Sequence, residues 1–76
     1  MKIKKGKVMK DIFAKRLKML RIREDLYQKD LAEILNVTLS SVSIWERGIN
    51  YPEVEKLIEM AYYFHVSIDY LLGLTD

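Results

Sequence analysis

The chain is short and has no cysteine, and these two facts together limit what it can fold into. It has 76 residues, of which 50% are hydrophobic and 32% are charged. A chain of this length supports one domain, and a domain this small buries only about 60% of its unfolded surface. Such a domain is marginally stable unless something supports it. Without cysteine, neither a disulfide nor a thiolate zinc site is available for that purpose.

The charged residues are segregated along the chain. Residues 1–23 contain ten lysines and arginines and one acidic residue, Asp11, whereas residues 24–76 contain three basic and ten acidic residues. A basic N-terminal segment indicates an anionic partner, either nucleic acid or an anionic membrane surface. A solvated, solubilising tail is the alternative interpretation.

Several classes of function find no support in the sequence. The longest apolar run, residues 60–64, is far shorter than the roughly 20 residues that span a membrane. The single histidine, His65, is too little for a histidine-rich metal site, and we expect it in a surface turn. A glycine-rich phosphate loop is absent, as is a histidine beside a candidate nucleophile. We therefore expect a soluble, cytoplasmic protein that is not an enzyme and takes no metal, cofactor or small-molecule substrate.

Apolar residues recur with the period of a helix, in runs separated by turn-forming residues. We predict helices over residues 11–24, 28–35, 38–47, 52–64 and 68–72. The predicted first residues or caps of four of them are Asp11, Thr38, Pro52 and Ser67. The turn residues expected in a left-handed conformation are Asp25, Asn36 and His65.

These helices predict a compact all-α domain over residues 11–74. Residues 1–10 lack a helical period, and we predict a basic arm there, with a short strand near Ile3 and Val8 as an alternative. No segment shows the alternation of a strand. In the fourth helix the stripe expected to be buried consists of Val54, Leu57, Ile58, Ala61 and Phe64.

The third predicted helix has two different faces. At 100° per residue, Val42, Trp45 and Ile49 point to one side, which we assign to the core. The other side is small, polar and basic with one apolar member, and it carries Ser40, Ser43, Ile44 and Arg47. This second face is expected to be turned outward.

One ordered set of residues extends over most of the chain. Its members are Arg16, Leu17, Lys18, Leu20, Arg21, Gln28, Leu31, Ala32, Val37, Thr38, Trp45, Glu46, Arg47, Gly48, Pro52, Leu57, Ala61, Val66, Ser67 and residues 69–73. The set resembles the Cro/CI-type, lambda-repressor-like helix-turn-helix family over about residues 12–73. The resemblance implies a five-helix fold in which residues 28–35, a tight turn and residues 38–47 form the helix-turn-helix. The second of these helices would enter a DNA major groove about 12 Å wide.

The resemblance also implies roles for individual residues. Gln28 and Arg47 match positions that contact backbone phosphates. The positions from which the family reads bases are held here by Thr38, Leu39, Ser40, Ser43 and Ile44. Arg21 and Glu46 match a pair that forms a partly buried salt bridge between the first and third helices.

The chain departs from the family pattern at two places. Tyr27 stands where a serine or threonine commonly caps the second helix, which weakens the cap by about 1 kcal/mol. On the reading face, Leu39 and Ile44 are apolar, and no Asn, Gln or Arg within the recognition helix is available for bidentate base recognition. Readout is then expected to depend on thymine methyl groups, hydroxyl contacts and DNA shape.

From these features we expect a transcriptional regulator, a repressor, that binds double-stranded operator DNA as a homodimer. At this length no separate ligand-sensing domain is expected. Leu71 or Leu74, in the last helix and after it, would contact the second copy. The alternative is a protein-interaction module of the same fold, such as an antitoxin or a phage regulatory partner. Its contact surface would then include Leu39 and Ile44.

Overall fold

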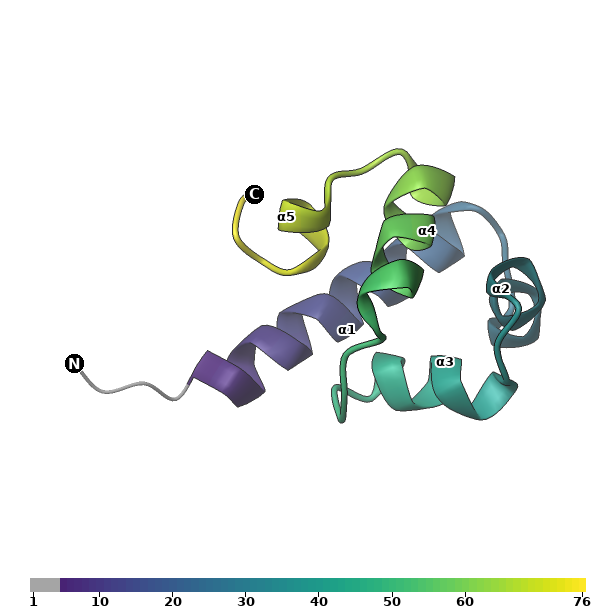
Figure 1. Ribbon diagram of the computed structural model, residues 1–76, viewed down its shortest axis with the longest axis horizontal. Helices are drawn as coiled ribbons and strands as arrows, with labels where there is room; N and C mark the ends of the chain where they lie inside the picture. Colours follow the sequence, from purple (N-terminus) through teal and green to yellow (C-terminus); the bar gives the residue numbers. More distant parts are fainter. Residues whose placement is uncertain (1–4) are drawn as a thin grey trace.

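The protein folds into five helices, seen in the computed structural model, which describes residues 5–76 (Figure 1). The helices are α1 (Lys5–Arg23), α2 (Gln28–Leu35), α3 (Leu39–Glu46), α4 (Val54–Phe64) and α5 (Ile68–Leu71). Residues 5–76 contain no strand, so the predicted all-α, five-helix architecture is confirmed. None of the helices in this part of the chain combines the length and the apolar character needed to cross a bilayer.

The first helix is longer than the sequence predicted. α1 begins at Lys5 rather than at Asp11, so the predicted arm is wrong for residues 5–10, and Val8 lies in a helix and not in a strand. Asp11 is therefore not a cap. It lies inside α1, where its carboxylate accepts a hydrogen bond from Lys7 Nζ at 3.1 Å, one turn earlier. The rest of the predicted arm, residues 1–4 with Ile3, lies outside the described residues.

This extension of α1 left no signal in the hydrophobic pattern because none of residues 6–10 is fully buried, and only Met9 and Lys10 are partly covered. Gly6, Lys7 and Val8 are all exposed, and an exposed turn needs no apolar stripe. Lysine and methionine are nevertheless good helix formers, and a helix already nucleated by its buried part extends at low cost. The predicted boundary between residues 10 and 11 therefore falls inside a continuous helix.

Three residues in the left-handed conformation end helices, as predicted. Asp25, Asn36 and His65 have φ angles of 57–58° and follow α1, α2 and α4. Asp and Asn adopt this conformation more readily than other non-glycine residues. His65 is exposed, in agreement with its assignment to a surface turn.

The beginnings of the helices agree with the prediction at Tyr27, Thr38 and Ser67 and, besides Asp11, differ at Pro52. The side chains of Thr38 and Ser67 accept hydrogen bonds from backbone N–H groups three residues later, at 3.1 and 2.9 Å. Tyr27 gives no such cap to α2; instead its own N–H donates to the Asp30 carboxylate at 2.8 Å. Pro52 is not the first residue of α4, because the extended Glu53 separates it from Val54.

One apolar cluster with members from every helix forms the core. Its largest members are Phe13, Leu17, Leu20, Leu31, Leu35, Val42, Trp45, Leu57, Met60, Phe64 and Leu71. On α4 the predicted stripe is partly wrong: Met60 is buried, whereas Val54 and Ile58 are 67% and 41% exposed. Ile49 is also half exposed, because the chain has left the helix before it. Leu71 is fully buried and is not available to a second copy.

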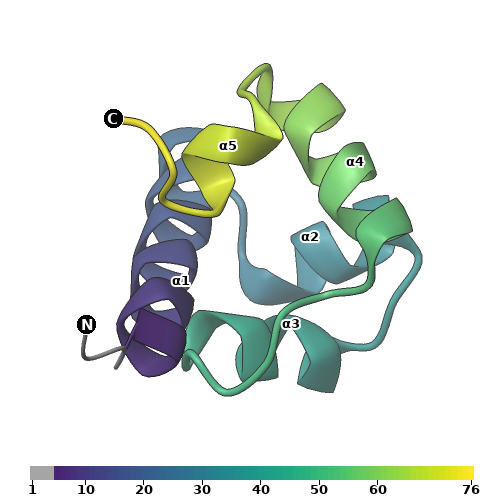
Figure 2. The same ribbon diagram turned by 60° about the vertical axis from the view of Figure 1, so that its left-hand side comes forward.

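Arg16 attaches the C-terminal part of the chain to α1. Its Nη1 donates to the backbone oxygen of Tyr70 and, at 2.7 Å, to that of Thr75. The guanidinium also lies 4.2 Å from the centre of the Tyr70 ring, a cation–π contact. α5 therefore lies across α1, as Figure 2 shows. Gly73 follows in the left-handed region, and a Cβ there would lie 2.9 Å from Ile12 Cγ2.

A buried ion pair attaches α3 to α1. Arg21 on α1 and Glu46 on α3 form a bidentate pair, with Nε–Oε2 at 2.7 Å and Nη2–Oε1 at 2.9 Å. Their side chains are only 11% and 4% exposed. The third donor position of the guanidinium, Nη1, reaches the Leu26 carbonyl at 2.7 Å. The hydrogen bond to Glu46 raises the pKa of Arg21 despite its burial, so the guanidinium stays charged.

We expect Arg21→Ala to cost about 3–5 kcal/mol of unfolding free energy, because it leaves the Glu46 carboxylate buried and unpaired. That is a large fraction of the total of about 5–15 kcal/mol typical of a domain. Urea unfolding measures the loss. Lys7→Ala is the matched control, since Lys7 and Asp11 form an exposed pair whose removal changes stability by about 0–0.5 kcal/mol.

A double variant isolates the cause of the loss. Arg21→Met with Glu46→Leu removes both charges, and replacing a buried pair by apolar residues is often neutral. The double variant should thus regain most of the stability that Arg21→Ala forfeits. Wild-type-like unfolding of Arg21→Ala itself would contradict a stabilising role of Arg21 opposite a buried Glu46.

Candidate nucleic-acid interface

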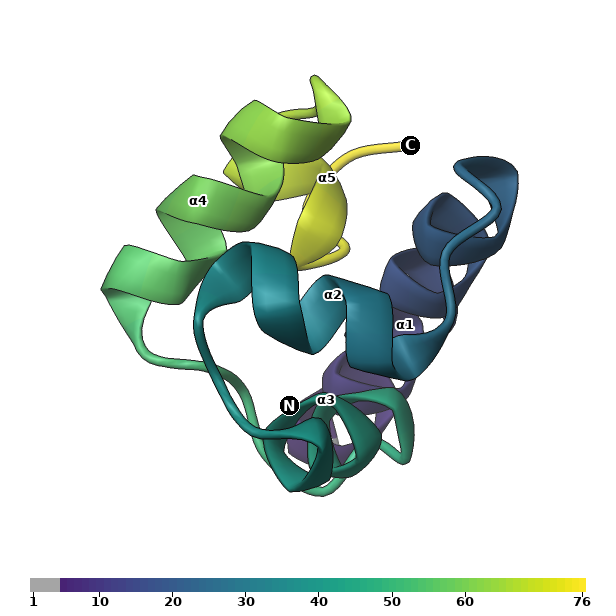
Figure 3. The same cartoon turned by 90° about the vertical axis from the view of Figure 1, so that its right-hand side faces the viewer.

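The second and third helices are held at a fixed angle by a short turn. Asn36, in the left-handed conformation, ends α2, and the next residue, Val37, donates its N–H to the Ala32 carbonyl at 2.9 Å. The Val37 side chain packs against the core from within the turn. Thr38 then caps α3. The result is two adjoining helices, with α3 at the outer edge of the molecule (Figure 3).

α3 separates its two faces as the sequence predicted, with two exceptions on the outer side. Val42 is fully buried and Trp45 is 7% exposed, so both belong to the core, as expected for Trp45. On the outer side, Leu39, Ser40 and Arg47 are exposed. Ser43 and Ile44 are the exceptions: both are only partly exposed, and Ile44 packs against the core cluster, so less of each faces outward than predicted.

Two hydroxyl groups at the start of α3 are already paired. Thr38 Oγ1 accepts the backbone N–H of Ser41 at 3.1 Å and lies 3.0 Å from Ser41 Oγ. The sequence analysis did not identify Ser41, which is half-buried. Thr38 therefore caps α3 in addition to lying on its outer face. Ser40, in the first turn of α3, is exposed.

Gln28 lies at the start of α2, where it is connected to the buried ion pair. Its side-chain N–H donates to Glu46 Oε1 at 3.1 Å, and the residue is half-buried. One amide N–H is used in this bond, and the amide retains a second N–H and its oxygen. A single carboxylate thus orients both Arg21 and Gln28.

Arg47 lies at the other end of α3, as its C-terminal cap. The residue is exposed, and its Nε approaches the Ser43 carbonyl at 3.4 Å. The guanidinium has five N–H donors, so four remain besides this one. A cation is also favourable at this end of a helix because of the helix dipole.

An open hollow of about 640 Å³ lies beside the first residues of α2 and α3. Its lining residues are Arg21, Tyr27, Gln28, Lys29 and Leu39. Tyr27 and Leu39 are 71% and 52% exposed. The sequence analysis did not name Lys29, which lines this hollow. Its place beside Gln28 at the start of α2 was the available signal, because helix N-termini favour anions.

Comparison with known proteins agrees with this geometry. A family model described as helix-turn-helix matches residues 17–71. The chain is 37% identical over 65 residues to YobD of Bacillus subtilis (strain 168), an uncharacterized HTH-type transcriptional regulator, covering 86% of this chain and 58% of that protein. It is 42% identical over 61 residues to the HTH-type transcriptional activator BcrR of Enterococcus faecalis, covering 80% of this chain and 30% of that protein.

A solved structure shows the same fold. The crystal structure of a transcriptional regulator from Listeria innocua superposes with a TM-score of 0.78 at 41% sequence identity, covering 84% of this chain and 60% of that one. The chain thus spans about a third to three fifths of the length of these similar proteins.

The family match, the helix order and the position of α3 lead to the same assignment. The relatives are named for transcriptional regulation and not for a reaction, in agreement with the expectation that the chain is not an enzyme. The matched residues 17–71 contain α2, the turn, α3, α4 and α5. The chain belongs to the Cro/CI-type helix-turn-helix family.

Proposed function

We propose that this chain is a DNA-binding transcriptional regulator that places α3 in the major groove of operator DNA. The observation that supports this most is the division of α3 into two faces. Val42 and Trp45 anchor the helix in the core, while the outer face carries small side chains that allow a close approach to base edges. An α-helix fits the major groove, which is about 12 Å wide. On this proposal the protein acts in the cytoplasm, where bacterial DNA is found.

In the proposed complex, Gln28 and Arg47 contact phosphates on the two sides of the groove. Gln28 stands at the start of α2, where free backbone N–H groups also favour an anion. Arg47 follows the end of α3 and is exposed. Lys29 and the phenol of Tyr27, beside the hollow, lie close enough to Gln28 to join the first of these contacts. Such contacts hold the protein in register but carry no sequence information directly.

Base reading falls to Thr38, Leu39, Ser40, Ser43 and Ile44. Leu39 is half exposed and suits a thymine methyl group, whereas the partly buried Ile44 presents only its outer part. The hydroxyl groups serve as weak, adaptable partners. None of these side chains makes a bidentate pair with a base, so we expect modest direct specificity supplemented by DNA shape.

We further propose that the protein acts as a homodimeric repressor. With Leu71 buried, the exposed apolar residues on α4 and after α5 that a second copy could cover include Ile58, Tyr62 and Leu74, which are 41%, 78% and 62% exposed. A two-fold pair of these domains would present two copies of α3 to half-sites about one DNA turn apart. Sedimentation at micromolar concentration should show a dimer. Monomer alone, both with and without DNA, would remove the dimer while leaving DNA binding open.

A protein-interaction module is the second candidate, favoured by the exposure of Leu39 and Tyr27 beside the hollow. Exposed apolar groups on a polar face are typical of protein-binding sites. The two candidates differ in their response to salt, because phosphate contacts release counterions and binding to DNA weakens as salt is added.

The two types of contact predict different effects of substitution. Arg47→Ala should weaken binding to an operator duplex and to a random duplex by similar factors. It should also reduce the magnitude of the log–log salt slope by about one unit, the value for one phosphate contact. Titration of both duplexes at several salt concentrations measures the two effects. Lys18→Gln is the control, since Lys18 is exposed on α1, outside the α2–α3 unit.

In the same titrations, Leu39→Ala and Ser43→Ala should change discrimination between the duplexes by about 1 kcal/mol or less, with the salt slope unchanged. Unaltered binding of Arg47→Ala to both duplexes would contradict the proposed function. Loss of binding to a protein partner in Leu39→Ala, without any effect on DNA, would favour the interaction module.

A further inference from the structure

We infer that the first turns of α1 form a second phosphate-binding surface, one that continues the interface of α3 along the DNA backbone. This inference rests on the proposed function, because it assigns a further contact to the same DNA. The residues concerned are Lys7 and Lys10, which lie in a helix where the sequence suggested an extended arm.

The first observation is that α1 extends beyond the core on the side of α3. Its first buried residue is Phe13, and the residues from Gly6 to Val8 are exposed. Figure 1 shows these turns projecting past the other helices, and Figure 2 shows the start of α1 beside α3. At 1.5 Å per residue, residues 5–12 have a length of about 12 Å. One DNA strand presents a phosphate about every 3.4 Å along its axis, so this length matches about three phosphates.

The second observation is direct contact between α1 and the turn that ends α3. Gly48 follows Arg47 with φ of 74°, and a Cβ on Gly48 would lie 2.6 Å from Asp11 Oδ1 and 3.6 Å from the Lys10 carbonyl. Glycine adopts this left-handed φ without strain, and the 3.6 Å distance to the Lys10 carbonyl is an ordinary van der Waals contact between α1 and the turn. The Lys10 backbone therefore contacts Gly48, the residue directly after Arg47, for which a phosphate contact is proposed.

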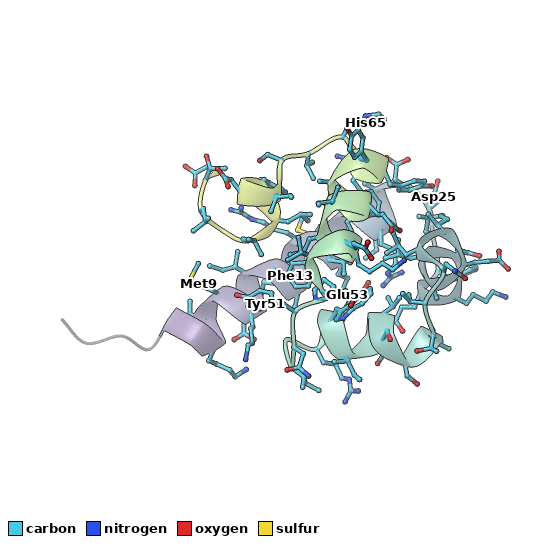
Figure 4. The ribbon with its side chains drawn as sticks, in the orientation of Figure 1. Met9, Phe13, Asp25, Tyr51, Glu53 and His65 are labelled. Atoms are coloured by element: carbon cyan, nitrogen blue, oxygen red, sulfur yellow. The ribbon has the colours of Figure 1, made fainter. Side chains whose placement is uncertain are left out.

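The same end of α1 is supported from the segment after the turn. The Tyr51 ring lies 5.6 Å from the Phe13 ring, centre to centre, in a tilted arrangement. Figure 4 shows Met9, Phe13 and Tyr51 at this end of the molecule. Because Gly48 and Tyr51, both on the segment that follows α3, contact α1, the first turns of α1 lie beside the end of α3.

The third observation is the distribution of charge. Residues 28–47, which form α2, the turn and α3, carry two basic and three acidic side chains, so this unit alone does not attract a polyanion. Residues 5–23 carry eight basic side chains and one acidic. Arg16, Arg21 and Arg23 of this group are bonded to the rest of the fold.

Lys10 is the best placed of the remaining cations. Among residues 5–76 it takes part in no ion pair. Lys7 pairs with Asp11, but that pair is exposed at 75% and 47% and is easily exchanged for a phosphate. An anionic membrane is a poorer partner for this surface, because Val8 is the one exposed large apolar side chain among residues 6–12.

The experiment compares Lys10→Gln and the double variant Lys7→Gln, Lys10→Gln with Lys18→Gln, which removes the same charge from an exposed site further along α1. The probe is a random-sequence DNA duplex longer than the interface, titrated at several salt concentrations. Removal of one phosphate-binding cation should lower the magnitude of the log–log slope by about 0.9. Lys10→Gln should show this decrease, the double variant up to twice as much, and Lys18→Gln none. Circular dichroism confirms that each variant keeps its helices.

The outcomes separate this inference from the proposed function. If Lys10→Gln behaves like Lys18→Gln while Arg47→Ala lowers the slope, the protein binds DNA without α1 and the inference is overturned. If the wild-type protein binds no duplex, both fail together. Binding to phosphatidylserine vesicles that depends on Lys10, with no duplex binding, would assign this surface to a membrane and overturn the inference.

Discussion

The ion pair between Arg21 and Glu46 is the interaction on which the arrangement of this domain depends. It is bidentate and buried, and it joins α1 to the end of α3 while Gln28 bonds to the same carboxylate. The direction of α3 and the start of α2 are therefore set by one group. A domain of this size has little apolar surface to bury, so a bidentate contact between two of its helices matters more than it would in a larger core. Gln28 and Arg47, for which DNA contacts are proposed, lie on either side of this ion pair.

The sequence predicted the order and most boundaries of the helices because the turns carry residues with specific backbone preferences. Asp25, Asn36 and His65 adopt left-handed conformations in a chain with few glycines. The beginning of α1 was not predictable from periodicity, since its first turns are exposed and bury no stripe. The rotation of α4 was missed for a related reason: Met60, Val54 and Ile58 are all apolar, and only tertiary packing decides which of them is buried.

For the candidate site, the sequence identified the residues better than their surroundings. The Arg21–Glu46 pair was predicted by family resemblance and is present. The bond from Gln28 to Glu46 joins residues 18 positions apart, and no local pattern reports such a contact. The partial burial of Ile44 was missed for the same reason. Helical spacing alone places Ile44 on the outer face, and only the packing of the folded chain shows that it is partly covered. The close approach of Gly48 to Asp11, which makes α1 part of the same surface as α3, also appears only in three dimensions.

The central claim is that the outer face of α3 reads DNA, and selection of bound sequences from a pool of random duplexes tests it most directly. The account predicts enrichment of thymine-containing half-sites in inverted orientation, about one helical turn apart. It also predicts a graded preference at each position, because no side chain makes a bidentate pair with a base. A pool that shows no enrichment after repeated selection, although the folded protein is present, would contradict the claim.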